Sequence, residues 1–456
     1  MIRHCLPLAA ALALALPLRA DDKPPDFAPL EATAAAEMKD AGIPGAAVAV
    51  VRGDRIVFAK GFGVTSVEGG PPVTPDTLFR LGSTTKMFTA AALVSLAEDG
   101  KLKLDAPIGQ YVKDLPPHFA LLTAHQLLTH TAGVTDETRL YGPLDEASLG
   151  REVRGWKADF LFAPPGKVYS YANPGYRIAG LVAEEVGGKP YADVLADRLF
   201  RPLGMKRSTF RPTMAMTYPL AQGHEKAAGG VAVIRPASES AAGWPAGSLF
   251  SSANDLSRWA VAFLNDGKLD GKDVLPPAVI ARISTRHVTV PGGRHYGYGL
   301  TIADHRGVPV VEHGGSRAGY GSFIRFLPTQ KAAVIVLCNT TGGQLPRTVE
   351  AATELLAPLG PRPGRPPGQP LTAEEAKKYA GRFTNNRGRA ALVERDGKLF
   401  FRRGPGPEQA VTKVGSDHLR TDPRAGTPGA DIHLVPGPDG VPEFLFVGGR
   451  AMKRIQ

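Results

Sequence analysis

Apolar and polar residues follow two different periods in the first hundred positions of the chain. Over residues 30–40 the apolar positions have helical spacing, which predicts a helix that ends near Gly42. Two short apolar runs follow at 46–51 and 56–61, and the turn sequence between them predicts a β-hairpin. A polar opening at Ser83 then leads into a long apolar stretch, which predicts a helix that ends near Gly100.

Helical patterns interrupted by proline and glycine dominate the centre of the chain, residues 106–212. Strand patterns return at 308–312, 322–326 and 332–338, and a further helix is predicted at 347–356. If the hairpin and the late strands form one antiparallel sheet, the first and last helices can cover one face and the central helices form an inserted lobe. The sequence therefore predicts an α/β (α+β) fold with a cleft between sheet and lobe.

A stretch rich in proline and glycine, residues 359–371, has the composition of a linker. Beyond it, short strand patterns alternate with turn sequences such as Asp396-Gly397 and Asp439-Gly440. We predict that residues 372–456 form a small, all-β, barrel-like domain and that residues 21–358 form the main domain. We also expect the main domain to fold after truncation behind Leu356.

The first twenty residues have the pattern of a secretory signal peptide. Arg3 and His4 precede an apolar run at 6–18, and Ala20 stands before an acidic pair. The run is short for a membrane span, and no later stretch approaches ~18 consecutive apolar residues. We expect a secreted or periplasmic protein without a transmembrane span in its mature chain. Of the two cysteines only Cys338 would then remain, so no intramolecular disulfide is expected.

Positive charge is concentrated near the end of the chain. The formal net charge is +11, and residues 360–456 hold 17 Lys or Arg against 10 Asp or Glu. No basic run with interleaved aromatic residues occurs, and export also argues against a nucleic-acid partner. A cell wall rich in phosphate or carboxylate is the better partner for the basic C-terminal domain.

Ser83-Thr84-Thr85-Lys86 is the only Ser-x-x-Lys sequence in the chain. If a helix begins at Ser83, Lys86 lies close to one turn later and shares its face. A lysine whose pKa is lowered by burial or by neighbouring cations can take the proton of a serine hydroxyl. A helix-capping serine followed by a solvated lysine explains the same residues equally well.

Two other motifs lie farther along the chain. Tyr171-Ala172-Asn173 is the only Tyr-x-Asn and precedes a predicted helix, where turn residues would also be expected. His313-Gly314-Gly315-Ser316 follows the strand 308–312 and could be a strand-ending turn with a structural histidine. In this order, the three motifs resemble the serine β-lactamase and penicillin-binding-protein superfamily. The resemblance is greatest to the branch of class C β-lactamases, D-peptidases and related esterases.

The resemblance covers most of residues 28–358 and implies the antiparallel sheet, flanking helices and helical lobe of that superfamily. It implies that Ser83 attacks a carbonyl and forms an acyl-enzyme, with Lys86 and Tyr171 sharing the proton transfer. Which of the two is the base stays open. We expect nearby cations to lower the pKa of the Tyr171 phenol and a dry cleft to lower that of Lys86. His130 is expected to be structural.

The remaining roles are also implied by the resemblance. Asn173, His313 and Gly315 would bind substrate, and the backbone N–H groups of Ser83 and Ser316 would form an oxyanion hole. No cofactor is implied, and the chain contains no metal-ligand motif of the zinc-hydrolase type.

His313 stands where β-lactamases carry the lysine of Lys-Thr-Gly, a sequence that this chain lacks. An ordinary histidine loses its charge above about 6.5, so we expect activity to depend on pH near about 6 to 7. We therefore expect a serine hydrolase of peptide-like amides or esters, of the D-amino-acid peptidase or esterase type. The alternatives are a β-lactamase and a non-catalytic, envelope-binding protein of the penicillin-binding type.

Overall fold

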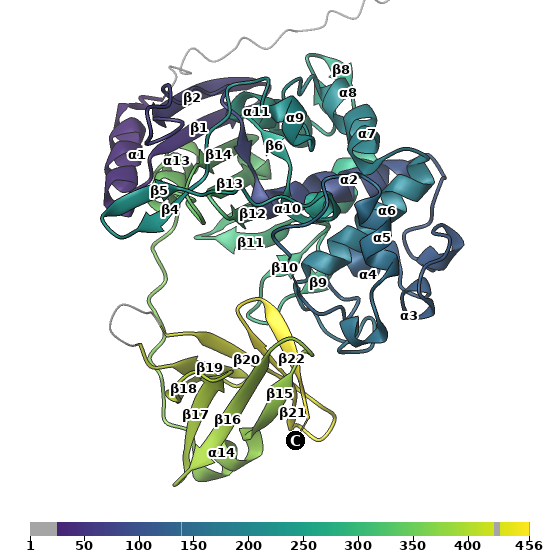
Figure 1. The fold of residues 1–456 in the computed structure, drawn as a ribbon. Coiled ribbons are helices and arrows are strands. Elements are labelled where there is room, and N and C mark those ends of the chain that lie inside the picture. Colours follow the sequence, from purple (N-terminus) through teal and green to yellow (C-terminus); the bar gives the residue numbers. More distant parts are fainter. Residues whose placement is uncertain (1–24, 138, 424–428, 456) are drawn as a thin grey trace, which may run out of the picture.

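The computed structural model describes residues 25–137, 139–423 and 429–455 (Figure 1). The expected signal peptide and Cys5 lie outside the described residues. Within the described ranges, no helix has the length and apolar character needed to cross a membrane.

The main domain is built on one 8-stranded antiparallel sheet, as the sequence predicted. The early hairpin forms one edge and pairs with the late strands through β14. In spatial order the strands are β2 (Arg55–Gly63), β1 (Gly45–Arg52), β14 (Ala332–Cys338), β13 (Tyr320–Leu327), β12 (Val308–Arg317), β11 (Thr301–His305), β10 (His295–Tyr296) and β9 (Val288–Thr289).

Strand β1 is apolar on both faces because helices cover the sheet on both sides. Ala46, Val48 and Val50 pack with α1 (Ala28–Ala41) and α13 (Pro346–Leu356). The alternate residues Ala47 and Ala49 belong to the larger core, which includes α2 (Lys86–Glu98) and α11 (Ala253–Leu264). A strand buried on both faces has a continuous apolar run, and that is the pattern of residues 46–51.

The helical lobe lies beside the sheet on the side of α2 (Figure 1). Its longest helix, α6 (Asn173–Gly187), packs against α2 and α10 (Trp244–Gly247). The other helices of the main domain are α3 (Pro117–Ala120), α4 (Ala124–Leu128), α5 (Ser148–Arg154), α7 (Tyr191–Leu195), α8 (Arg201–Leu203), α9 (Pro212–Ala215), α10 (Trp244–Gly247) and α12 (Pro277–Ile283). Three small ribbons complete the domain, formed by β3 (Phe79–Arg80) with β6 (Phe250–Ser251), β4 (His224–Ala227) with β5 (Gly230–Val233), and β7 (Lys268–Leu269) with β8 (Lys272–Asp273).

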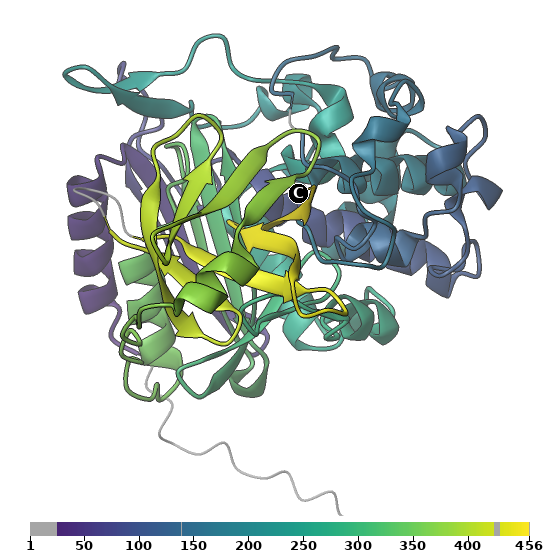
Figure 2. The same ribbon diagram turned by 90° about the horizontal axis from the view of Figure 1, so that it is seen from below.

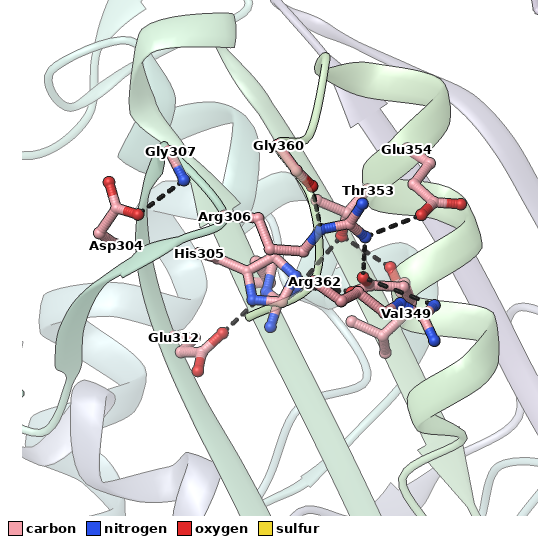
Figure 3. Close-up of polar contacts among 12 residues, drawn as sticks. Asp304, His305, Arg306, Gly307, Glu312, Val349, Thr353, Glu354, Gly360 and Arg362 are labelled. Carbon is pink, nitrogen blue, oxygen red and sulfur yellow. Dashed lines mark hydrogen bonds and ion pairs between the residues drawn. The ribbon is translucent and has the colours of Figure 1, made fainter. Parts of the chain in front are cut away.

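The chain leaves the main domain at a network of charged side chains (Figure 3). Arg306, between β11 and β12, donates from Nε to the Gly360 carbonyl at 2.6 Å. Its Nη1 also pairs with Glu350 at 2.5 Å and with Glu354 at 2.9 Å, both on α13. His305 Nε2 lies 2.7 Å from Glu350. The start of the connecting segment is thus held on the sheet.

The C-terminal part is a closed eight-stranded barrel with one short helix, α14 (Ala373–Tyr379). Its apolar core, which includes Phe383, Leu419 and Ile432, is separate from the core of the main domain. The strands are β15 (Gly381–Thr384), β16 (Arg389–Arg395), β17 (Lys398–Arg403), β18 (Gln409–Gly415), β19 (His418–Thr421), β20 (Asp431–Pro436), β21 (Pro442–Val447) and β22 (Arg450–Arg454).

The barrel lies against one end of the main domain, near β9 and β10 (Figure 1), and Figure 2 views the molecule from the barrel side. Phe444 and Phe446 of β21 join Phe162, Tyr169 and Tyr296 in one buried apolar cluster. Removing the barrel would expose this cluster to water. For this reason we now expect a chain cut behind Leu356 to be less stable than the full chain.

Candidate active site

Ser83 lies in a 3₁₀ turn, η1 (Gly82–Thr85), and the α-helix begins only at Lys86. The sequence predicted a helix from Ser83 onward. The tighter turn starts at Gly82, whose φ of 57° lies in the left-handed region that glycine adopts easily. A Cβ atom on Gly82 would lie 2.6 Å from the Ser316 nitrogen. This glycine therefore allows the Ser83 turn to approach β12.

Lys86 is fully buried, and its Nζ has three oxygen neighbours. It lies 2.7 Å from Asn173 Oδ1, 2.7 Å from the Ala246 carbonyl and 3.2 Å from Ser83 Oγ. Burial lowers the pKa of Lys86 well below its usual value. A neutral amine has two N–H donors and one lone pair. When Lys86 is neutral and donates to the two carbonyl oxygens, its lone pair is left for the Ser83 hydroxyl.

Tyr171 completes the group around Ser83. Its hydroxyl hydrogen-bonds with Ser83, and its ring centroid lies 4.8 Å from Lys86 Nζ. The prediction of a lowered pKa was wrong. Burial raises the pKa of Tyr171, and this effect outweighs the lowering by the Ser83 hydrogen bond and the Arg450 charge. Tyr171 is therefore a neutral phenol that can donate a proton.

His313 lies within β12, because the strand continues through Arg317 instead of ending at Glu312. Its Nδ1 is 2.6 Å from the Gly314 carbonyl, and its Nε2 is 3.1 Å from the Tyr296 hydroxyl. Burial, with the Lys86 charge second, lowers the pKa of His313 to about 4. The predicted dependence on pH near 6 to 7 is therefore not expected from this residue. At neutral pH it is an uncharged imidazole that donates from Nδ1 and accepts at Nε2.

Gly315 and Ser316 continue the same strand. A Cβ atom on Gly315 would lie 1.8 Å from the Leu81 carbonyl oxygen, so this glycine allows β12 to pack against the chain just before Ser83. The structure thus shows a packing role for Gly315, and its expected role in substrate binding stays a prediction. Ser316 and Ser83 line a cavity of about 150 Å³ together with Asn173. Both expected oxyanion donors thus belong to residues that border this cavity.

Asp136 and Arg450 were missed by the sequence analysis. Asp136 Oδ1 accepts hydrogen bonds from the Asn173 backbone at 2.8 Å and from its side-chain Nδ2 at 3.1 Å. Asp136 Oδ2 accepts from Arg450 Nε at 2.9 Å and Nη2 at 2.6 Å. Nothing in the sequence indicates that Arg450 of the barrel reaches Asp136.

His130 has the structural position that the sequence analysis gave it. It is buried, accepts a hydrogen bond from the Ala172 backbone at 3.1 Å, and its ring lies 4.3 Å from that of Tyr171. Burial lowers its pKa well below the usual value, so it is uncharged. It therefore packs against the Tyr171 ring and holds the backbone of the next residue, Ala172. Among the described residues, no group of His, Cys, Asp and Glu side chains could hold a metal ion.

Lys86 and Tyr171 each contact Ser83, and Ser83 and Asn173 line the cavity. This arrangement agrees with the sequence match of the main domain. The β-lactamase family model matches residues 30–358. The chain belongs to the β-lactamase family.

Two curated relatives have about the same identity. Penicillin-binding protein 4 of Amycolatopsis lactamdurans is 31% identical over 323 residues, which are 65% of this chain and 81% of that protein. Unguisins hydrolase ungD' of Aspergillus campestris (strain IBT 28561) is 32% identical over 326 residues, 66% of this chain and 59% of that protein. The match thus spans less than two thirds of the length of the Aspergillus protein.

The solved structure of SurE resembles the whole architecture, barrel included. It covers 94% of this chain and 98% of SurE with a TM-score of 0.78 and 26% identity. A second SurE structure, with D-Leu, has a TM-score of 0.76 at the same identity and covers 94% of this chain and 99% of SurE. The likeness extends over the barrel, which the family model does not cover.

Proposed function

We propose that the protein is an exported serine hydrolase that forms an acyl-enzyme at Ser83 and acts on peptide-like amides or esters. The observation that carries this proposal is the position of Lys86. Its Nζ lies 2.7 Å from the Asn173 and Ala246 oxygens and 3.2 Å from Ser83 Oγ, so a neutral amine that donates to the first two presents its lone pair to the hydroxyl. A buried, neutral lysine in this position is a general base for the serine.

The proposed reaction begins with transfer of the Ser83 proton to Lys86 while Oγ attacks the substrate carbonyl. The negative charge on the former carbonyl oxygen is stabilised by the backbone N–H groups of Ser83 and Ser316, and one such donor contributes roughly 3 kcal/mol. Tyr171 then gives its proton to the leaving nitrogen or oxygen as the bond to the carbonyl carbon breaks. The Tyr171 phenolate recovers a proton from Lys86. Water releases the acyl group by the same steps in reverse order.

A D-amino-acid peptide or ester is the substrate class that we favour. SurE was solved with D-Leu, and ungD' is named a hydrolase of unguisins. An uncharged His313 also lacks the fixed cation that a lysine offers to a substrate carboxylate. Arg139, Arg177 and Arg317 line the same cavity, so the site still offers cations to an anionic substrate group. The preference for amides and esters over β-lactams therefore rests on the absence of a Lys-Thr-Gly sequence. The β-lactamase alternative has support in the relationship to penicillin-binding protein 4.

Covalent labelling tests the proposal. A fluorophosphonate and a fluorescent penicillin should be compared on the wild-type protein and on Ser83→Ala, together with turnover of p-nitrophenyl esters and D-aminoacyl p-nitroanilides. We expect Ser83-dependent labelling by the fluorophosphonate and turnover of the esters. Absence of both would favour the non-catalytic, envelope-binding alternative. Labelling and turnover confined to β-lactams would favour the β-lactamase.

The barrel offers a surface for the proposed wall contact. A hollow of about 1300 Å³ beside β15–β17 is lined by Arg382, Arg387, Arg389, Arg402 and Asp159. Arg387 pairs with Asp159 and Glu137, and Arg402 pairs with Glu408. Such a surface suits an anionic polymer. Binding to isolated cell walls that falls as salt rises, and falls further in Arg389→Gln, is expected. Export is tested by fractionation of cells that express the full chain.

A further inference from the structure

We propose that the C-terminal barrel supplies part of the active site. The turn between β21 and β22 holds the Tyr171 loop in place, and Arg450 acts through Asp136 as a positioning residue for Asn173. This inference rests on the proposed function, because it concerns acylation of Ser83. It also gives the barrel a role that its separate core does not suggest.

The first line of support is a pair of hydrogen bonds, each donated by a backbone N–H group, between the barrel and the loop before α6. The Tyr171 N–H donates to the Gly449 carbonyl at 3.0 Å. The Ala451 N–H donates to Ser170 Oγ at 3.1 Å. Ser170 and Ala451 are buried, so these groups lack water as an alternative partner. Two successive residues of the loop are therefore held by the barrel.

The second line of support is a chain of polar contacts from Arg450 to Lys86. Arg450 binds Asp136 Oδ2, and Asp136 Oδ1 binds Asn173 Nδ2. This contact orients the Asn173 amide so that its Oδ1 faces Lys86 Nζ. Asp136 is mostly buried, and without Arg450 its carboxylate would lose a charged partner. The orientation of Asn173 thus depends on a residue of the barrel.

Asp136 and Arg450 also act on Lys86 in opposite directions. Asp136 raises the pKa of Lys86, whereas Arg450 and Arg177 lower it, in an environment where burial is the largest influence. The titratable and charged groups that face Lys86 are Asp136, Tyr171, Tyr176, Arg177, His130, His313 and Arg450. Removal of either member of the Arg450–Asp136 pair should therefore shift the pH profile, and the two shifts should have opposite signs.

An interface ion pair can also be merely structural, and the barrel provides such a pair for comparison. Lys167 lies 3.0 Å from Glu443 across the same interface, and this pair is partly exposed. Within the described residues, neither Lys167 nor Glu443 forms a hydrogen bond or ion pair with Ser83, Lys86 or Asn173. Lys167→Met is therefore a control that weakens the interface and leaves the Asp136–Asn173 contact in place.

The experiment measures kcat/KM for a p-nitrophenyl ester against pH in the full chain, for wild type, Arg450→Met, Arg450→Lys, Asp136→Asn and Lys167→Met. Arg450→Met should lower kcat/KM about ten- to hundredfold, mainly through kcat, because the reacting groups are misplaced. Its acid limb should move to higher pH and that of Asp136→Asn to lower pH, each by about half a unit or more. Arg450→Lys should recover part of the rate. Lys167→Met should stay within about threefold of wild type.

A second measurement does not depend on turnover. Hydrogen exchange of the peptide that contains residues 169–173 should be faster in Arg450→Met than in wild type and unchanged in Lys167→Met. The inference is overturned if Arg450→Met keeps the wild-type rate, pH profile and exchange. It is also overturned if Lys167→Met shows the same losses. If wild type has no Ser83-dependent turnover, the proposed function fails, and the exchange experiment alone decides whether the barrel holds the loop.

Discussion

Gly82 and Ser316 pack so closely that any side chain at position 82 would lie within 3 Å of the Ser316 backbone. This contact places the two candidate oxyanion donors on facing segments, the turn η1 and strand β12. The distance between the two segments depends on Gly82, because this residue has a positive φ and because a Cβ atom would collide with β12.

Gly82→Ala should therefore impair acylation more than folding. The alanine must either adopt the left-handed region or push β12 away, and a shift of about 1 Å at the oxyanion site can cost roughly a hundredfold in rate. The labelling rate with fluorophosphonate measures this loss, and the melting temperature measures folding. Gly53→Ala is a suitable control, because Gly53 also has a positive φ but its Cβ would meet nothing within 4 Å. A Gly82→Ala protein that labels as fast as this control would contradict the expectation.

Lys86→Ala and Tyr171→Phe should affect different proton transfers, the first from Ser83 and the second to the leaving group. Lys86→Ala removes the proposed base and should slow acylation by at least ~10²-fold for every leaving group. Tyr171→Phe removes the proposed acid, so its loss should be large for p-nitroanilides, whose amine needs a proton. It should be smaller for p-nitrophenyl esters, whose phenolate leaves unaided. Equal losses of Tyr171→Phe on both substrates would argue against the assignment of Tyr171 as the acid.

Lys86 should also set the acid limb of the pH profile. Its pKa is lowered in the folded protein, so the neutral amine is present only above that lowered value. Activity should therefore rise with pH through this range and then level off, well below the pH at which an exposed lysine loses its proton. Single-turnover acylation measured between pH 5 and 10 checks this. Activity that has not levelled off by pH 10, as expected for an unperturbed lysine with a pKa near about 10.4, would show that Lys86 is not the base.

His313 should leave the profile unaffected between pH 5 and 8, because its pKa is lowered to about 4. His313 should instead affect how the free energy of unfolding depends on pH. The unfolded chain binds a proton at this histidine near about 6.5, before the folded protein does, so stability should fall as pH drops from about 6.5 toward 4. Urea unfolding at pH 7 and pH 5 should show a larger loss for wild type than for His313→Asn. Equal losses would mean that His313 is charged in the folded protein.

The sequence was sufficient for the residues that lie in motifs and insufficient for those that depend on packing. Ser83 and Lys86 follow from local spacing, and Tyr171, Asn173 and His313 from the order of motifs in the chain. Arg450 lies 314 residues from Asp136. The contact between them depends on how the barrel docks through Phe444 and Phe446, and no periodicity encodes that docking.

The course of β12 illustrates a second limit. Gly314-Gly315 predicts a turn, since glycine is unfavourable within strands. In the structure both glycines are strand residues that pair with β13. Glycine is needed at both positions because Gln344 and the Leu81 carbonyl occupy the space of the missing Cβ atoms. The pKa values of Tyr171 and His313 were misjudged for a related reason. Burial dominates both, and burial depends on the packed neighbours.

Phe446→Ala tests whether the two cores unfold together. The ring belongs to the apolar cluster shared with Tyr169 and Tyr296, and its loss should cost about 3 kcal/mol. If the barrel supports the site, Ser83 labelling should be lost at a lower temperature in this variant. Leu419→Ala is the matched control, because Leu419 is fully buried in the barrel's own core. If Ser83 of Phe446→Ala is still labelled at temperatures at which the barrel has unfolded, the cluster does not couple the two parts. The main domain would then remain folded with Tyr169 and Tyr296 exposed to water.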